Sequence, residues 1–145
     1  MASAFVDANV FIYGTSPTAP MAANCQAILR LASARRETCL TSAEVLQEVL
    51  HVLLRQNQST RVLLAIRLAT QAVDVVPLTV EEVIAAAETP VPAGLSARDR
   101  IHLATMRHYG ITNIISADRA FDDVPGITRL DPARLDEWSE TVFGS

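Results

Sequence analysis

The 145-residue chain contains no lysine, so its 12 basic residues are all arginines. A nucleotide-binding loop of the G-x-x-x-x-G-K-[ST] type is thereby excluded, because that loop uses a lysine to contact the phosphates. Arginine is well suited to bidentate phosphate contacts. A compositional bias toward arginine is the simpler explanation of the same observation, so the arginines alone do not identify a ligand.

Cysteine and long apolar runs are also scarce. Cys25 and Cys39 form neither a C-x-x-C pair nor a metal-binding cluster, so two free thiols are expected. No apolar run approaches the roughly 20 residues of a membrane-spanning helix, and the N-terminus has no signal-peptide pattern. We therefore expect a cytoplasmic protein without a membrane segment. The formal net charge of −4 excludes a generally basic protein that coats DNA.

The hydrophobic content and length predict one α/β domain that spans residues 1–145. Half of the residues are hydrophobic, which suffices for a core at this length without disulfides or a structural metal. Short β-type runs alternate with longer helical patterns, and this alternation favours βαβ units with a parallel sheet covered by helices. The expected strands lie at residues 4–6, 39–40, 73–76, 114–115 and 127–130.

Six segments carry helical patterns with recognisable starts, at residues 21–36, 41–56, 59–72, 79–90, 96–110 and 131–138. Three of them are expected to open with a capping box, in which a Ser or Thr precedes an acid by three residues. The predicted boxes are Thr41 with Glu44, Thr79 with Glu82, and Ser96 with Asp99.

Two aspartates follow predicted strands directly. Asp7 ends the strand at residues 4–6, and Asp118 comes shortly after the strand at residues 114–115. Open parallel sheets bind ligands beyond the carboxyl ends of their strands, so both acids are candidate site residues. Asp122 follows Asp118 by about one helical turn and is a weaker candidate. Asp7 and Asp118 could each serve instead only as the N-cap of a following helix.

Two further acids lie near the apolar faces of predicted helices. Glu48 falls on the margin of an apolar stripe, and Asp99 shares a face with His102 and Leu103. A carboxylate near a core is costly unless a cation pairs with it. The structural alternatives are a surface pair with Arg55 for Glu48 and the capping box alone for Asp99.

Together the four acids predict a site for a divalent cation. Ionised carboxylates at close range repel one another, so such a cluster requires protons or cations. Oxygen ligands select hard ions, which points to Mg²⁺ or Mn²⁺. The three histidines match no zinc-binding spacing, and His102 and His108 are expected at the core edge or surface. Receiver domains and dehalogenase-type phosphatases use similar acids but require a lysine, and this chain has none.

Four segments resemble, in order and separation, the motifs of PIN-domain ribonucleases. They are residues 7–11 (DANVF), 42–50 (SAEVLQEVL), 96–104 (SARDRIHLA) and 116–122 (SADRAFD). The resemblance covers essentially the whole chain, and the length is similar to that of the VapC toxins of VapBC toxin–antitoxin pairs. It implies a three-layer α/β/α sandwich with a central parallel sheet of four to five strands.

The same resemblance implies an endoribonuclease that depends on Mg²⁺ or Mn²⁺, forms a homodimer and binds a VapB-like antitoxin. The implied roles fall on residues that match the motifs. Asp7, Glu48, Asp99 and Asp118 would be the catalytic, metal-binding acids, Asp122 an additional metal ligand, and Asn9 and Ser116 the residues that shape the site.

Two alternatives remain open within the resemblance. Glu44 could replace Glu48 as the second acid, and a PIN fold without catalysis could serve as a binding or assembly module. The presence of all four acids favours catalysis. Arg98, Arg100 and Arg119 adjoin the acids in sequence, so they are candidates for contacts to RNA phosphates.

Overall fold

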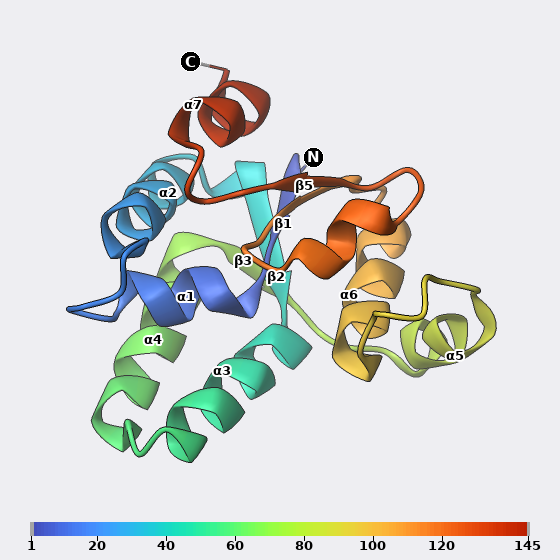
Figure 1. Cartoon of the computed structure of the whole chain (residues 1–145), viewed down its shortest axis with the longest axis horizontal. Helices are drawn as coiled ribbons and strands as arrows, with labels where there is room; N and C mark the ends of the chain where they lie inside the picture. The colour runs from blue at the N-terminus through green and yellow to red at the C-terminus, as the bar shows by residue number, and fades with distance from the viewer. Residues whose placement is uncertain (1, 145) are drawn as a thin grey trace.

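Five short strands form one parallel sheet in the computed structural model, which describes residues 2–144 (Figure 1). The strands are β1 (Ala4–Val6), β2 (Cys39–Ser42), β3 (Asp74–Val76), β4 (Asn113–Ile115) and β5 (Thr128–Leu130). Their order in the sheet is β3-β2-β1-β4-β5, and every neighbouring pair is parallel. The expected parallel sheet is confirmed.

Helices cover both faces of this sheet, as a three-layer α/β/α sandwich requires. One face carries α1 (Ala8–Gly14), α2 (Ala22–Ala34), α3 (Ala43–Arg55) and α4 (Ser59–Ala72), and the other carries α5 (Val80–Glu88) and α6 (Ala97–His108) (Figure 1). A short helix, α7 (Leu135–Trp138), continues into a π-helical turn, η3 (Ser139–Phe143). None of the described helices is long and apolar enough to cross a membrane.

The strand order positions a crevice between β1 and β4. The chain moves outward from β1 through β2 to β3, then crosses to the opposite side of β1 to form β4 and β5. A reversal of this kind opens a crevice beyond the carboxyl ends of the two central strands, where open α/β sheets bind ligands. The backbone N–H of Asp7 donates to the carbonyl of Ile115 at 3.1 Å, so β1 and β4 stay paired up to this edge.

The core lies on both faces of β1, whose three residues have no exposed surface. Phe5 and Ile114 from the sheet pack with buried helical side chains such as Phe11 and Ile28. Cys25 and Cys39 are free and buried, as expected, and burial raises the pKa of each thiol to about 12. Both thiols are therefore unreactive core side chains.

The helix starts match the predicted capping boxes in part. Ser96 and Asp99 form the predicted box at the start of α6. Thr79 caps α5, but the carboxylate of Glu82 accepts a hydrogen bond from Thr105 on α6 instead. The prediction at Thr41 is wrong, because Thr41 lies within β2, where its hydroxyl donates to the carbonyl of Val6 at 2.7 Å.

The cap of α3 is supplied one residue later than predicted. Ser42 is the N-cap residue, and its side chain accepts a hydrogen bond from the backbone N–H of Val45. Glu44 is therefore released from the capping role that the sequence suggested. The sequence predicted helix α1 only through the alternative in which Asp7 is a helix N-cap, because its seven residues are too short to show a period.

Candidate active site

Asp7 is the most enclosed acid of the site. It is the N-cap of α1, where Oδ1 accepts a hydrogen bond from the N–H of Ala8 at 2.8 Å. Oδ2 accepts from the hydroxyl of Ser116 at 2.6 Å and from the amide of Asn9 at 3.2 Å. Only 4% of the residue is exposed. The carboxylate thus caps α1 through Oδ1 and is held by Ser116 and Asn9 through Oδ2, so the capping role does not exclude a place at the site.

Asn9 and Ser116 connect Asp7 to the end of β4. The Asn9 amide also donates to Ser116 Oγ at 3.1 Å, and Asn9 Oδ1 accepts from the N–H of Ala117. Ser116 Oγ in turn accepts from the N–H of Asp118 at 3.0 Å. These bonds fix the two strand ends relative to each other and place Asn9 and Ser116 beside Asp7.

The other three predicted acids line one pocket of about 550 Å³ between α3, α6 and the segment after β4. Glu48 comes from α3, Asp99 from the first turn of α6, and Asp118 from the N-cap of η2 (Arg119–Asp123). Asp118 Oδ1 accepts from the N–H of Ala120 at 3.0 Å, so it too combines a capping role with a place in the pocket. Four separate elements thus bring the four acids together.

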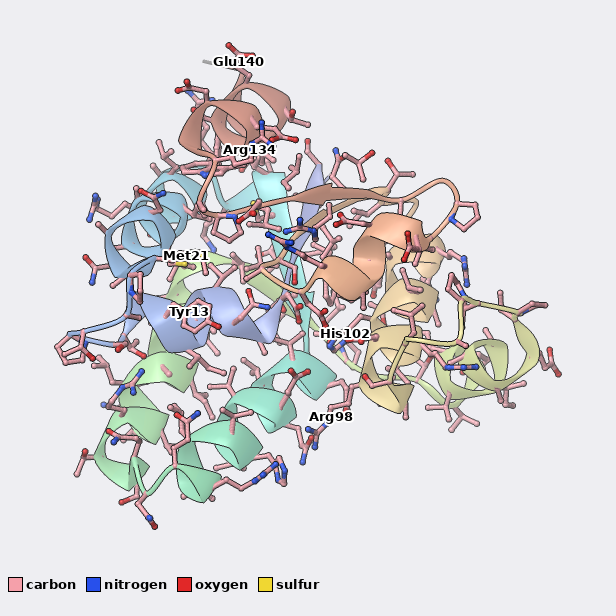
Figure 2. All side chains as sticks on the ribbon, viewed as in Figure 1. Tyr13, Met21, Arg98, His102, Arg134 and Glu140 are labelled. Carbon is pink, nitrogen blue, oxygen red and sulfur yellow. The ribbon has the colours of Figure 1, made fainter. Side chains whose placement is uncertain are left out.

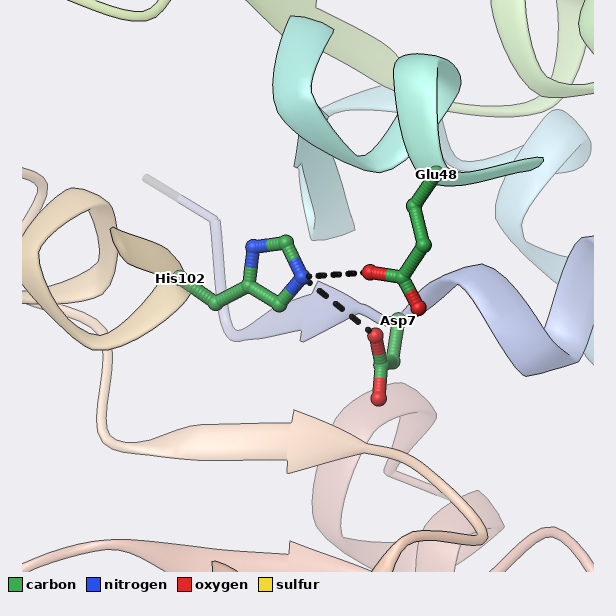
Figure 3. Close-up of side chains that lie close together, drawn as sticks. All are labelled: Asp7, Glu48 and His102. Atoms are coloured by element: carbon green, nitrogen blue, oxygen red, sulfur yellow. Dashed lines mark hydrogen bonds and ion pairs between the residues drawn. The ribbon is translucent and has the colours of Figure 1, made fainter. Parts of the chain in front are cut away.

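His102 joins the acids as a fifth titratable group. Its Nε2 lies 3.2 Å from Glu48 Oε1 and 3.7 Å from Asp7 Oδ1 (Figure 3). The ring is fully buried, so the expectation of a core-edge or surface histidine is wrong. The sequence held one signal, since His102 follows Asp99 by one helical turn on the face that faces the core.

The electrostatics of the site follow from its burial. Burial raises the pKa of Asp7, even though the nearby His102 and the Ser116 hydrogen bond favour its charged form. Burial, together with the charges of Asp118 and Asp7, raises the pKa of Asp99. Burial would lower the pKa of His102, but the hydrogen bond to Glu48 and the charge of Asp7 outweigh it, and the net shift is upward.

These shifts fit a site for a cation. None of the described ion pairs joins an arginine to Asp7, Asp99 or Asp118. The basic group beside Asp7 is the imidazole of His102, whose Nε2 lies 3.7 Å from Oδ1. Among the described residues, Asp7, Glu48 and His102 each offer one ligand atom, and these atoms lie within 4.8 Å of one another. A divalent cation would offset both the burial and the mutual repulsion that raise the pKa of Asp7 and Asp99.

The pKa of Asp7 also predicts how the stability of the metal-free protein depends on pH. Because the folded pKa lies above the unfolded value of 3.8, the stabilisation from proton binding is present below pH 3.8 and is lost as the pH rises through the folded pKa. The unfolding free energy should therefore fall with rising pH more steeply in the wild type than in Asp7→Asn. Urea unfolding in a chelator from pH 4 to pH 7 measures the difference, and parallel profiles would contradict it.

Asp122 lies apart from the four acids in this structure. It is exposed, and the guanidinium of Arg129 holds its carboxylate with Nε–Oδ1 and Nη2–Oδ2 distances of 2.8 Å and 3.3 Å. This hydrogen bond lowers the pKa of Asp122. Arg129 also donates to the carbonyl of Ser116 at 3.0 Å. Asp122 thus supports the segment that carries Ser116, and a role as a metal ligand remains a prediction.

Arg98 is the arginine that lines the acidic pocket. Both Arg98 and His102 extend from α6 toward α3 (Figure 2). The guanidinium of Arg98 donates to Gln47 at 2.9 Å and lies 3.4 Å from Glu44. Glu44 is thus paired with Arg98, whereas Glu48 is paired with His102 at the centre of the site.

Comparison with known proteins agrees with this geometry. The sequence profile of the PIN domain matches residues 4–127. Ribonuclease VapC13 of Mycobacterium tuberculosis is 36% identical over 136 residues, which is 86% of this chain and 97% of the relative. The crystal structure of VapC20 of Mycobacterium tuberculosis, a sarcin–ricin loop cleaving toxin, superposes with a TM-score of 0.66 at 24% identity. That match covers 86% of this chain and 98% of VapC20.

A toxin–antitoxin complex shares the fold as well. VapBC2 from Rickettsia felis, bound to a DNA fragment from its promoter, gives a TM-score of 0.64 at 9% identity. The alignment covers 88% of this chain and 97% of the matched chain. At this identity the likeness establishes the fold alone, which is the three-layer arrangement described above.

Proposed function

Because the chain belongs to the PIN domain family, and within it to the VapC ribonucleases, we propose that its acidic pocket hydrolyses RNA phosphodiester bonds with Mg²⁺ or Mn²⁺. Family membership makes the chain a nuclease of the toxin type. The observation that carries the residue assignment is that Asp7, Glu48, Asp99 and Asp118 converge from four elements, with Asp7 buried and its pKa raised.

The four acids are the side chains that would hold the cation. When bound, a divalent cation supplies Lewis-acid stabilisation of the charge that develops on the phosphate and on the leaving oxygen. Ser116 and Asn9 orient Asp7 by donating hydrogen bonds to Oδ2, which leaves Oδ1 directed toward Glu48 and His102. The site is therefore held in one geometry before any ligand binds, which favours catalysis.

Arginines near the pocket are suited to hold the RNA backbone. We assign this role to Arg98, which lines the pocket, and to Arg100 and Arg119, which adjoin Asp99 and Asp118 in the chain. A guanidinium can contact a phosphate with two parallel hydrogen bonds. Arg98 would have to exchange its contacts with Glu44 and Gln47 for such a phosphate.

A VapB-like antitoxin is the proposed protein partner, since VapBC complexes share the fold. An apolar groove of about 590 Å³ lies between α1, α2 and α4 and is lined in part by Leu29, Leu64 and Leu68. Leu64 is 58% exposed, and exposed apolar patches commonly mark protein contacts. We also propose that the chain is one domain and that it forms a homodimer, both by likeness to the family.

Removal of the metal tests this function. The purified protein should cleave structured RNA in millimolar Mn²⁺, and excess EDTA should abolish cleavage, because the acids alone supply no Lewis acid. A DNA oligonucleotide of the same sequence serves as the control substrate. Mn²⁺ should also raise the melting temperature by offsetting repulsion among the acids. The absence of both effects would favour a binding module without catalysis.

A further inference from the structure

His102 offers the site a nitrogen ligand that the acidic motifs do not include. We propose that His102 Nε2, together with Asp7 and Glu48, binds the cation directly and gives the site a preference for transition-metal ions such as Mn²⁺ over Mg²⁺. This inference rests on the proposed metal-dependent function and specifies the chemistry of the same site.

The distances among the three side chains suit a shared cation. An octahedral ion with bonds of about 2.1 Å places adjacent ligand atoms about 3.0 Å apart. His102 Nε2 is 3.2 Å from Glu48 Oε1 and 3.7 Å from Asp7 Oδ1 (Figure 3). All three ligand atoms lie within 4.8 Å of one another. An octahedral ion holds opposite ligand atoms about 4.2 Å apart, so movements of less than about 1 Å would bring the three atoms to one ion.

The surroundings of the imidazole hold Nε2 in this position. The ring has no exposed surface and packs against Phe5, with the ring centroids 5.5 Å apart. The described contacts of Nε2 are both to carboxylates of the site, Glu48 and Asp7. The side chain therefore directs its nitrogen into the acidic centre, and it is too enclosed to turn toward solvent.

The other ring nitrogen leaves the tautomer free to change. Nδ1 is buried and has no hydrogen-bond partner among residues 2–144. In a neutral imidazole, one nitrogen donates while the other accepts. Because Nδ1 has no partner, no hydrogen bond at that atom fixes which ring nitrogen carries the proton. Without a cation Nε2–H can donate to Glu48, and with a cation the proton can reside on Nδ1 while Nε2 provides its lone pair.

A nitrogen ligand changes which ions the site favours. Mg²⁺ prefers oxygen ligands and retains several waters, whereas imidazole binds transition metals well, with affinity rising from Mn²⁺ to Co²⁺ and beyond. A site of carboxylates alone would give little such preference. Two carboxylates and one buried imidazole should therefore bind Mn²⁺ and Co²⁺ more tightly than Mg²⁺.

Pulsed electron paramagnetic resonance on the Mn²⁺-loaded wild-type protein tests the ligand directly. Directly bound imidazole nitrogen should give a ¹⁴N coupling, which changes to the ¹⁵N pattern when all histidines are labelled. His102→Gln should lose this coupling, because glutamine retains a hydrogen-bond donor to Glu48 but has no imidazole nitrogen. His51→Gln is the matched control, since His51 is exposed on the same helix as Glu48.

Calorimetric titration with Mn²⁺ and with Mg²⁺ gives the second readout. Metal affinity falls 10–100-fold even when a group that supports a ligand is lost. We therefore expect His102→Gln to weaken Mn²⁺ binding at least about tenfold and Mg²⁺ binding only about twofold. His51→Gln should change neither constant.

The outcomes separate this inference from the function on which it rests. Mn²⁺ binding by the wild type without nitrogen coupling would overturn the inference and leave the proposed nuclease intact. A ratio of Mn²⁺ to Mg²⁺ affinity that is the same in His102→Gln as in the wild type would also overturn the inference and leave the nuclease intact. Failure of the wild type to bind either ion would overturn both. The wild-type spectrum is decisive even if the variant folds poorly.

Discussion

Asp7→Asn is expected to abolish RNA cleavage and to raise the melting temperature of the metal-free protein. Asparagine retains the size and shape of Asp7 but removes its buried charge, and burial has raised the pKa of this carboxyl. Loss of a metal ligand removes several kcal/mol of transition-state stabilisation, which corresponds to a rate loss of about 10³-fold or more. Relief of the buried charge should raise the metal-free melting temperature by roughly 2–6 °C.

Two assays on the same protein preparation measure this pair of effects. Initial rates of RNA cleavage in Mn²⁺ report the first, and thermal unfolding in EDTA reports the second. Asp136→Asn provides a control, because Asp136 is an exposed aspartate of α7 outside the pocket. Full activity of Asp7→Asn would rule out the assigned role, and a lower metal-free melting temperature would contradict the electrostatic argument.

Glu48→Gln is expected to reduce cleavage at least about 100-fold, whereas Glu44→Gln should reduce it by less than about fivefold. The two glutamates are one helical turn apart on α3. Glu48 lines the pocket and lies within 3.2 Å of His102, while Glu44 forms a partly exposed ion pair with Arg98. Because the substitution and the helix are the same, a difference in cleavage rate between the two variants reflects where each carboxylate lies relative to the cation.

Cleavage rates at saturating Mn²⁺ and the Mn²⁺ dissociation constant should both be measured for these variants. A weakened dissociation constant in Glu48→Gln alone would agree with its place beside Asp7. If Glu44→Gln were the inactive variant, the choice between the two acids would be wrong. Arg98 would then be a positioning residue for Glu44 and would have no role in RNA binding.

The sequence was sufficient to predict the sheet and the acids at its edge. Alternating apolar runs and helical patterns indicated parallel strands, and the acid after each central strand marked the edge where ligands bind. Asp7 and Asp118 posed a choice between helix capping and a functional site. The structure shows a cap at both positions, and both carboxylates also lie at the site, so the two roles are compatible.

The parts that sequence reasoning missed depend on contacts between distant elements. Spacing rules describe neighbours on one helix, and they assigned Glu44 to a local box because Thr41 precedes it by three residues. Thr41 is instead drawn into β2 by its bond to Val6. The partner of Glu48 lies 54 positions away on α6. Only the packing of α3 against α6 reveals that His102 belongs to the acidic centre.

The long sequence separation within the site has a consequence for biosynthesis. Ser116 and Asp7 share a hydrogen bond although they are 109 positions apart, and β4 must be present before β1 has neighbours on both sides. A nascent chain therefore lacks an assembled centre until the ribosome has made most of the protein. An enzyme that cleaves RNA is thus harmless to its own message during most of translation, and products truncated before β4 are expected to be inert.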